Sequence, residues 1–362
     1  RVVLGDLSPA ASFIAANYNI PFDTEAFANQ AQSLLDRVQE ELGWMYETLH
    51  SDGMGVGRIN YTVWSEVFSC PECAGEIVFM DEAFDPNTKK IADTVRCPHC
   101  SVELTKEQMN LQFETVANSD GSLTRRPRRK MVMINYEFRG KNYMKRPDAY
   151  DLSLMERIAS LPVPKALPLD LFPDSQMRRV GRMATTETCA VSSMFLPRAA
   201  QALAKMWELA LQCQDARVQH MMLFFVEQAI WTMSVLNRYR PSGFSQVNQY
   251  LTGVFYVPSQ IAEPSPWYVL EGKRKRLIKA FQTINTPRHD AFVQTASCEA
   301  TLLPDNSVDY IFTDPPFGEN IYYADLNYLV ESWHRVWTAT EEEAIVDRVR
   351  NKSVAHYQSA MR

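Results

Sequence analysis

Two sets of residues in this chain have the types and spacing needed for chemistry. The first is Asp314-Pro315-Pro316-Phe317, which follows a short apolar, β-prone stretch expected to be a buried strand, Tyr310 to Thr313. Because proline fixes its own φ and restricts the residue before it, the Asp314 carboxylate and the Pro315 carbonyl have little freedom. A carboxylate, a carbonyl and an aromatic ring in this order suit the amino edge of a nucleobase. The alternative is a strand that ends in a plain Pro-Pro turn.

The second set is a pair of Cys-x-x-Cys motifs. Cys70-Pro-Glu-Cys73 and Cys97-Pro-His-Cys100 are separated by 23 residues, and apolar β-type residues flank both. Four thiolates at this spacing predict one tetrahedral Zn²⁺ site, with a structural role because no position remains for water. Disulfides are the weaker alternative, since the other three cysteines are scattered. His99 lies inside the second motif and is expected to face solvent.

An acidic residue near the start of the sequence is a candidate nucleotide ligand. The stretch from Val2 to Asp6 predicts a strand that ends in an acid, with Ser8 as N-cap and Pro9 as the first helical residue. In nucleotide-binding α/β folds such an acid accepts hydrogen bonds from ribose hydroxyls. Helix capping is the competing interpretation of Asp6. The glycine-rich loop expected before this strand would lie upstream of residue 1.

Basic residues gather between Arg125 and Arg182. This stretch has 14 Lys/Arg against 6 Asp/Glu, a local charge of +8, while the whole chain carries −6 and the remainder therefore −14. Cations interleaved with tyrosines beside a metal-binding segment predict a surface that follows nucleic-acid phosphates. A solvated charged hairpin is the alternative. The candidate nucleic-acid ligands are Arg125, Arg126, Arg128, Arg129, Lys130, Lys141, Lys145 and Arg146.

Apolar periodicity predicts the elements that must position these residues. The expected helices are Asn29 to His50, Pro197 to Gln212, Arg217 to Arg238, Glu271 to Phe281 and Tyr322 to Thr340. The expected strands include Tyr61 to Phe68, Met131 to Phe138 and Ala291 to Ala296. Strands and helices in this alternation favour an α/β fold, in which ligands bind at the carboxyl ends of the strands.

Composition places the chain among ordinary globular proteins. It has 362 residues, of which 46% are hydrophobic and 22% charged. No apolar run reaches membrane-spanning length, and no signal peptide opens the sequence. The expected location is therefore the cytoplasm, with no membrane partner.

Taken together, the Asp314-Pro-Pro-Phe317 motif, the Val3 to Pro9 stretch and the basic zinc segment resemble the amino-group DNA methyltransferases. Within that family the chain is most similar to bacterial and archaeal DNA methylases with an internal cysteine knuckle, for which the run from Phe312 to Asn327 is characteristic. The resemblance implies a Rossmann-like, S-adenosylmethionine-dependent core with an inserted zinc-ribbon and β-rich DNA-binding segment. On this view residues 1–58 begin the core without its glycine loop, 59–185 form the insert, and 186–362 supply helices and the catalytic part.

The resemblance also implies site roles. Asp314, Pro315, Pro316 and Phe317 would form the catalytic motif, and the residues that contact the cofactor would be Asp6, Ser8, Ser297 and Asp314. Asp in the first motif position and an aromatic residue in the last favour adenine N6 over cytosine N4, which stays the alternative base. No Pro-Cys dipeptide is present, which argues against covalent cytosine-C5 chemistry.

The implied partner is double-stranded DNA, with subunits of a restriction or defence system as further candidates. A second hypothesis comes from another class of protein. The chain could be a non-catalytic DNA-binding subunit of such a system, which uses the zinc ribbon and the basic hairpin alone.

Overall fold

One long strand, β3 (Val56–Ser69), organises the middle of the molecule. The computed structural model describes all residues except 118–122, 180–181, 248–254, 285–290, 300 and 302. β3 is rich in β-branched and aromatic residues, and almost all of it is buried. It pairs antiparallel with β12 (Arg129–Phe138) on one side and with β16 (Gln260–Pro264) on the other.

Within the described ranges, the sheet around β3 has nine strands, and its pairings are antiparallel. The main order is β13-β12-β3-β16-β14-β15, and β2, β4 and β9 pair with β3 outside this path. The remaining strands of this sheet are β2 (Glu47–Leu49), β4 (Glu76–Val78), β9 (Asn110–Leu111), β13 (Lys141–Lys145), β14 (Asn237–Tyr239) and β15 (Ser245–Val247).

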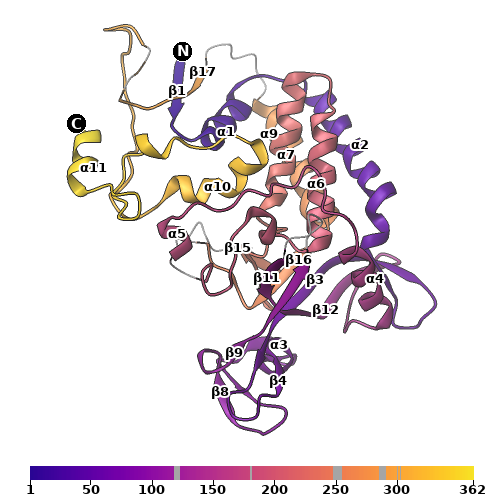
Figure 1. Cartoon of the computed structure of the whole chain (residues 1–362). Helices are drawn as coiled ribbons and strands as arrows, with labels where there is room; N and C mark the ends of the chain where they lie inside the picture. Colours follow the sequence, from indigo (N-terminus) through magenta and orange to yellow (C-terminus); the bar gives the residue numbers. More distant parts are fainter. Residues whose placement is uncertain (118–122, 180–181, 248–254, 285–290, 300, 302) are drawn as a thin grey trace.

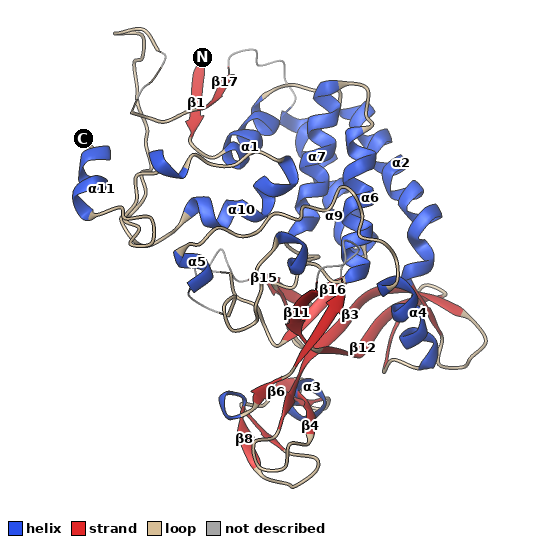
Figure 2. Ribbon diagram, viewed as in Figure 1, coloured by secondary structure: helices blue, strands red, loops and turns tan. Residues whose placement is uncertain are grey.

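A layer of helices covers one side of this sheet (Figure 2). Its members are α2 (Thr24–Leu42), α6 (Pro197–Leu211), α7 (Ala216–Ile230) and α9 (Pro266–Ile284). The predicted helix at Asn29 to His50 starts earlier, because Asp23 caps it by accepting from two backbone N–H groups. It also ends earlier, since the residues after Leu42 form a 3-10 turn and then β2, which pairs with β3.

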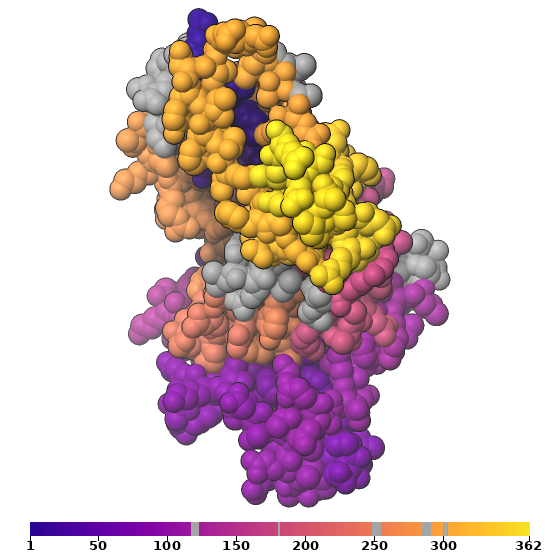
Figure 3. Space-filling view, turned by 90° about the vertical axis from the view of Figure 1, so that its left-hand side faces the viewer, coloured from indigo at the N-terminus to yellow at the C-terminus, as the bar shows by residue number. Residues whose placement is uncertain are grey.

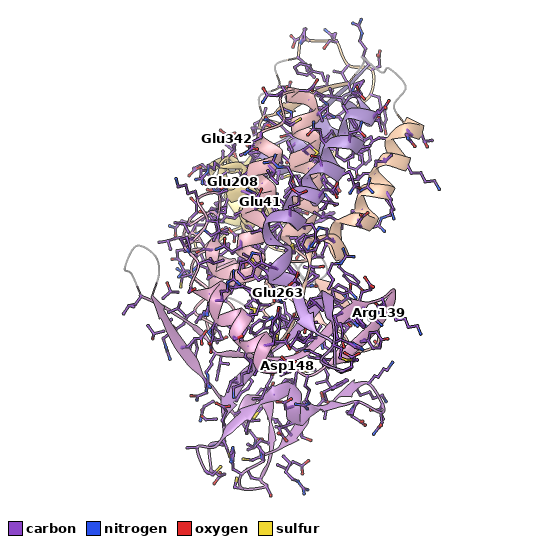
Figure 4. The ribbon with its side chains drawn as sticks, turned by 90° about the vertical axis from the view of Figure 1, so that its right-hand side faces the viewer. Glu41, Arg139, Asp148, Glu208, Glu263 and Glu342 are labelled. Carbon is purple, nitrogen blue, oxygen red and sulfur yellow. The ribbon has the colours of Figure 1, made fainter. Side chains whose placement is uncertain are left out.

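The helices and the sheet share one large apolar core. A buried ion pair crosses their junction: Arg198 Nη2 of α6 lies 2.5 Å from Glu263 Oε2 of β16, and each side chain is at most 1% exposed. Trp64 Nε1 donates to the same carboxylate at 2.8 Å. Figure 4 shows Glu263 where the helices meet the strands. Removal of either partner would leave an uncompensated buried charge, so this pair is costly to break.

The end of β3 farthest from the helices extends into a separate cysteine-containing lobe, at the bottom of Figure 1. Here Cys70, Ile77, Phe79, Val95 and Leu104 belong to a second, smaller core. The lobe consists of α3 (Phe79–Ala83), β5 (Phe84–Asp85), β6 (Lys90–Ile91), β7 (Thr94–Arg96) and β8 (Glu103–Thr105). After β9 the hairpin β10 (Phe113–Ala117) and β11 (Leu123–Pro127) leads back to β12.

At the opposite end, β1 (Val2–Asp6) pairs with β17 (Ala291–Thr295). Among the described residues, this is the one pair of strands that runs parallel. The predicted N-cap Ser8 and first-turn Pro9 are confirmed in α1 (Pro9–Asn19). α1 packs on both strands and also contacts α10 (Tyr323–His334). The Rossmann-like core remains a prediction, since a two-stranded parallel sheet is compatible with it but does not define it.

The remaining helices are α4 (Ala149–Ala159), α5 (Gln176–Arg179) and α11 (Val354–Ala360).

Two features differ from the sequence-based picture. The stretch from Tyr310 to Thr313 is not a strand, and Tyr310, Ile311 and Phe312 are 75–80% exposed. Its residues suit a strand, but a strand also requires a backbone partner, and no described segment pairs with it. In addition, β3 runs across the expected boundary at residue 58, and β14, β15 and β16 join the sheet of the expected insert.

Among the described residues, no helix is both long enough and apolar enough to span a membrane.

Candidate functional site

The four predicted cysteine ligands converge on one point. The distances Cys70 Sγ to Cys100 Sγ and Cys73 Sγ to Cys97 Sγ are both 3.7 Å, and all four sulfurs lie within 4.8 Å of one another. Four sulfurs at about 2.3 Å from one tetrahedral ion would lie roughly 3.8 Å apart. The structure therefore confirms that these cysteines can hold one metal ion, and their geometry is compatible with zinc.

Local backbone geometry explains this convergence. In each motif the residue after the second cysteine, Ala74 or Ser101, has a positive φ and donates its N–H to the carbonyl of the first cysteine at 2.9 Å. The two knuckles thus have the same fold, with one buried and one exposed cysteine each. Burial opposes ionisation of Cys97, but hydrogen bonds from the backbone of Cys100 and His99 and from the neighbouring thiols lower the pKa of Cys97 to about 6. The same thiol–thiol hydrogen bonds raise the pKa of Cys73 and Cys100, so one thiolate of the cluster is favoured over the others.

His99 lies at the edge of the cysteine cluster and is exposed. Its Nε2 lies 3.1 Å from the carbonyl oxygen of Glu76, which follows the first knuckle. The Glu76 carboxylate in turn accepts from Arg128 at 2.5 Å and from Lys130. The hydrogen bond from Lys130 lowers the pKa of the Glu76 carboxyl. Through Glu76, the first knuckle is connected directly to the basic strand.

Most of the predicted nucleic-acid ligands are ion-paired. Their partners are acids that lie outside the basic stretch in sequence: Arg125 with Glu187, Arg126 with Glu114, Arg128 and Lys130 with Glu76, and Arg146 with Asp81. The local charge of +8 is therefore partly neutralised by the fold. Exposed ion pairs contribute little stability, so these cations can exchange a carboxylate for another anion at small cost.

Three cations of the predicted set do not form exposed ion pairs of this kind. Lys145 is 9% exposed and donates to Asp148 at 2.7 Å and to Asp151 at 2.9 Å, so it joins β13 to the start of α4. Although burial acts in the other direction, these carboxylates raise the pKa of Lys145. Lys141 is exposed at the start of β13. Arg129 is half-buried, and its Nε has no hydrogen-bond partner in the described part of the chain.

The predicted cofactor residues Asp6 and Ser297 lie at the same edge of the parallel pair. Asp6 is opposite Thr295, at the carboxyl ends of both strands, and Ser297 follows two residues later. One oxygen of the exposed Asp6 carboxylate accepts from Ser8 N at 2.8 Å. Asp6 therefore stabilises the turn into α1 and leaves its second oxygen at the surface.

Ser8 is buried and connects the start of α1 to α10. Its hydroxyl donates to Glu331 Oε1 at 2.7 Å and accepts from Asn327 Nδ2 at 2.9 Å, and both partners belong to α10. It also caps α1 by accepting from Ala11 N at 3.3 Å. These contacts fix the start of α1 against the helix that follows the Asp-Pro-Pro-Phe motif.

The motif itself lies in an exposed segment without regular secondary structure. The side chains of Asp314 and Phe317 are exposed, Phe317 by 66%. Tyr357 Oη of α11 donates to the Pro316 carbonyl at 2.9 Å, and Arg348 pairs with Glu319 at 3.1 Å. The last part of the chain therefore holds the motif from the side. Neither contact has a local sequence signal, because the partners are far apart in the chain.

A hollow lies between these parts on the face shown in Figure 3. Residues from the start of the chain, in indigo, are visible at its bottom, and residues from the C-terminal third, in orange and yellow, surround it. Residues from the two ends of the chain thus share one face of the molecule.

Comparison of the chain with protein-family models, curated proteins and solved structures finds no match.

Proposed function

We propose that this protein is an S-adenosylmethionine-dependent DNA methyltransferase that acts on adenine N6. The observation that supports the proposal most is the parallel pair β1 and β17, with Asp6 and Ser297 at its carboxyl edge. The Ser8 contacts to Asn327 and Glu331 join this edge to α10, which begins five residues after Gly318. A nucleotide-binding edge and an amino-group motif in one structural unit are what such an enzyme requires.

The residues of this edge fit the proposed cofactor at its nucleoside end. Asp6 is exposed and has one carboxylate oxygen left to accept from ribose hydroxyls, and Ser297 follows the end of the neighbouring strand by two residues. Bound S-adenosylmethionine would supply an activated methyl group. Ser8 would act indirectly, because its hydroxyl is buried and occupied by α10.

The motif would activate the amine as follows. The lone pair of an exocyclic amine is delocalised into the base, which makes the nitrogen a poor nucleophile. Asp314 and the Pro315 carbonyl would each accept one amine hydrogen, and the nitrogen would become more tetrahedral and more nucleophilic. Asp314 would then take the surplus proton from the nitrogen once that nitrogen has accepted the methyl group. Positioning would supply much of the rate increase.

The exposure of Phe317 supports a role in holding the base. An amino group inside a duplex cannot be reached, so the target base has to leave the stack. A ring that is 66% exposed next to Asp314 offers a flat surface for the flipped base.

The cysteine lobe would be the structural zinc element of the DNA-binding part. The sulfur spacing of 3.7 Å supports zinc, and four protein ligands leave no open position for catalysis. Glu76 connects the first knuckle to Arg128 and Lys130, so a bound ion would also order the basic strand.

Replacement of Asp314 tests this proposal. Asp314→Asn keeps the shape but removes the charge, and we expect methyl transfer to DNA to fall by at least about a hundredfold. DNA binding, measured separately, should change little. The matched control is Asp309→Asn, which alters an exposed acid of the same segment and should keep the parent rate. Equal rates for Asp314→Asn and the parent would refute the proposed chemistry.

A further inference from the structure

Three arginines and two glutamates lie close together where the cysteine lobe joins the sheet. Arg126 pairs with Glu114 at 2.7 Å, and Arg182 pairs with Glu66 at 2.8 Å. The third arginine, Arg129, forms no ion pair in the described part of the chain, and its buried Nε has no hydrogen-bond partner there. The group therefore has one positive charge more than its acids neutralise.

Arg129 lies in the centre of this group. It begins β12 and is directly opposite Glu66 of β3, so the two side chains share one face of the sheet. Arg126, Arg182 and Glu114 are close enough for their charges to act on it as well. Burial is the main reason that the pKa of Arg129 is lowered to about 10. A guanidinium in this setting is destabilising unless something pairs with it.

The neighbouring acidic side chains do not pair with the Arg129 guanidinium. Glu66 is fully buried, and its Oε2 is taken by Arg182, whose other nitrogen donates to Val257 O and Ser259 Oγ. Glu66 Oε1 is buried without a partner in the described residues. Arg126 uses its Nε for Glu114 and is one-third exposed. Arg129 and Arg126 thus retain guanidinium N–H groups that can serve an external anion.

We propose that Arg129, flanked by Arg126 and Arg182, binds a backbone phosphate of nucleic acid. The planar guanidinium fork matches phosphate geometry, and a partly desolvated site strengthens the interaction. Arg128 and Lys130, on either side of Arg129, are both tied to Glu76 of the cysteine lobe, which fixes the strand. This inference deepens the DNA-binding part of the proposed function and rests on it.

A phosphate role and a structural role predict opposite effects of Arg129→Met on stability. If the residue serves a ligand, its removal leaves the free energy of unfolding unchanged or raises it, because an unpaired cation is lost. If Arg129 instead stabilises Glu66 within the fold, removal lowers that free energy. The matched control is Arg37→Met, which removes the same charge from an exposed position on α2.

Binding of a fluorescently labelled DNA duplex, measured by anisotropy over a range of salt concentrations, tests the inference. We expect Arg129→Met to weaken binding by about tenfold and to reduce the slope of log K against log salt by about one, whereas Arg37→Met leaves both unchanged. Arg129→Lys keeps the charge but loses the planar guanidinium. Its affinity for DNA should lie between those of Arg129→Met and the parent. Urea unfolding of the same variants provides the stability measurement.

Three results would overturn the inference. One is binding by Arg129→Met equal to that of Arg37→Met. Another is a loss of stability in Arg129→Met that Arg129→Lys restores, which would make the residue a partner of Glu66. The third is tight binding of inorganic phosphate alone that depends on Arg129, which would assign the site to a free anion. If the parent protein binds no DNA at all, the proposed function fails too; if only Arg129→Met behaves like the parent, this inference alone fails.

Discussion

At the scale of single residues, one hydroxyl group contacts the candidate motif and another fixes the helix that follows it. Ser8 joins the start of α1 to Asn327 and Glu331 of α10, and Tyr357 of α11 donates to the Pro316 carbonyl. The sequence identified Ser8 correctly as an N-cap, and its cofactor role is a prediction from the family resemblance. It could not identify Tyr357, which is 41 residues from its partner and in no motif. Contacts of this kind depend on tertiary structure alone.

The Tyr357 hydroxyl should matter for rate rather than for binding. Tyr357→Phe removes one hydrogen bond to the prolyl carbonyl next to the proposed amine acceptor, and we expect kcat for methyl transfer to fall by roughly three- to tenfold, with the KM for DNA unchanged. Steady-state kinetics measure both quantities. Tyr18→Phe, at an exposed position on α1, is the control and should match the parent. An equal kcat for Tyr357→Phe would show that the hydroxyl does not position the motif.

At the scale of elements, patterns with local causes could be predicted. The start of α1, the hairpin of β12 and β13, strand β17 and the two cysteine knuckles follow from caps, turns and spacing. Features that depend on distant partners could not. The exposed stretch from Tyr310 to Thr313 has the residues of a strand but no described strand beside it. The ion pairs of the basic stretch could not be predicted either, because their acidic partners, Glu76, Glu114 and Glu187, lie outside it in the sequence.

The cysteine lobe should depend on its metal. Its core is small and includes Cys70 and Cys97 themselves, so loss of the ion removes both ligand bonds and packing. We expect about one zinc per chain in the purified protein, and Cys97→Ser should lose it. Limited proteolysis should then cut within residues 70–111 while the helical layer survives. Cys213→Ser, outside the cluster, is the control. A protease-resistant lobe without metal would contradict the assignment.

At the scale of the whole molecule, β3 connects two parts. One part contains the helical layer and the parallel pair β1 and β17, and the other is the cysteine lobe with the basic strands. The net charge of −6 repels polyanions in general, so DNA would approach where cations gather. The arginine group around Arg129 belongs to these basic strands, and under the proposed function it would contact DNA there.

The most direct test of the central claim is transfer of a labelled methyl group from S-adenosylmethionine to duplex DNA by the purified protein, followed by digestion and separation of the nucleosides. The account predicts label in N6-methyladenine. Label in N4-methylcytosine would keep the enzyme class and correct the base. DNA binding without label in any base would contradict the claim and favour the non-catalytic DNA-binding subunit.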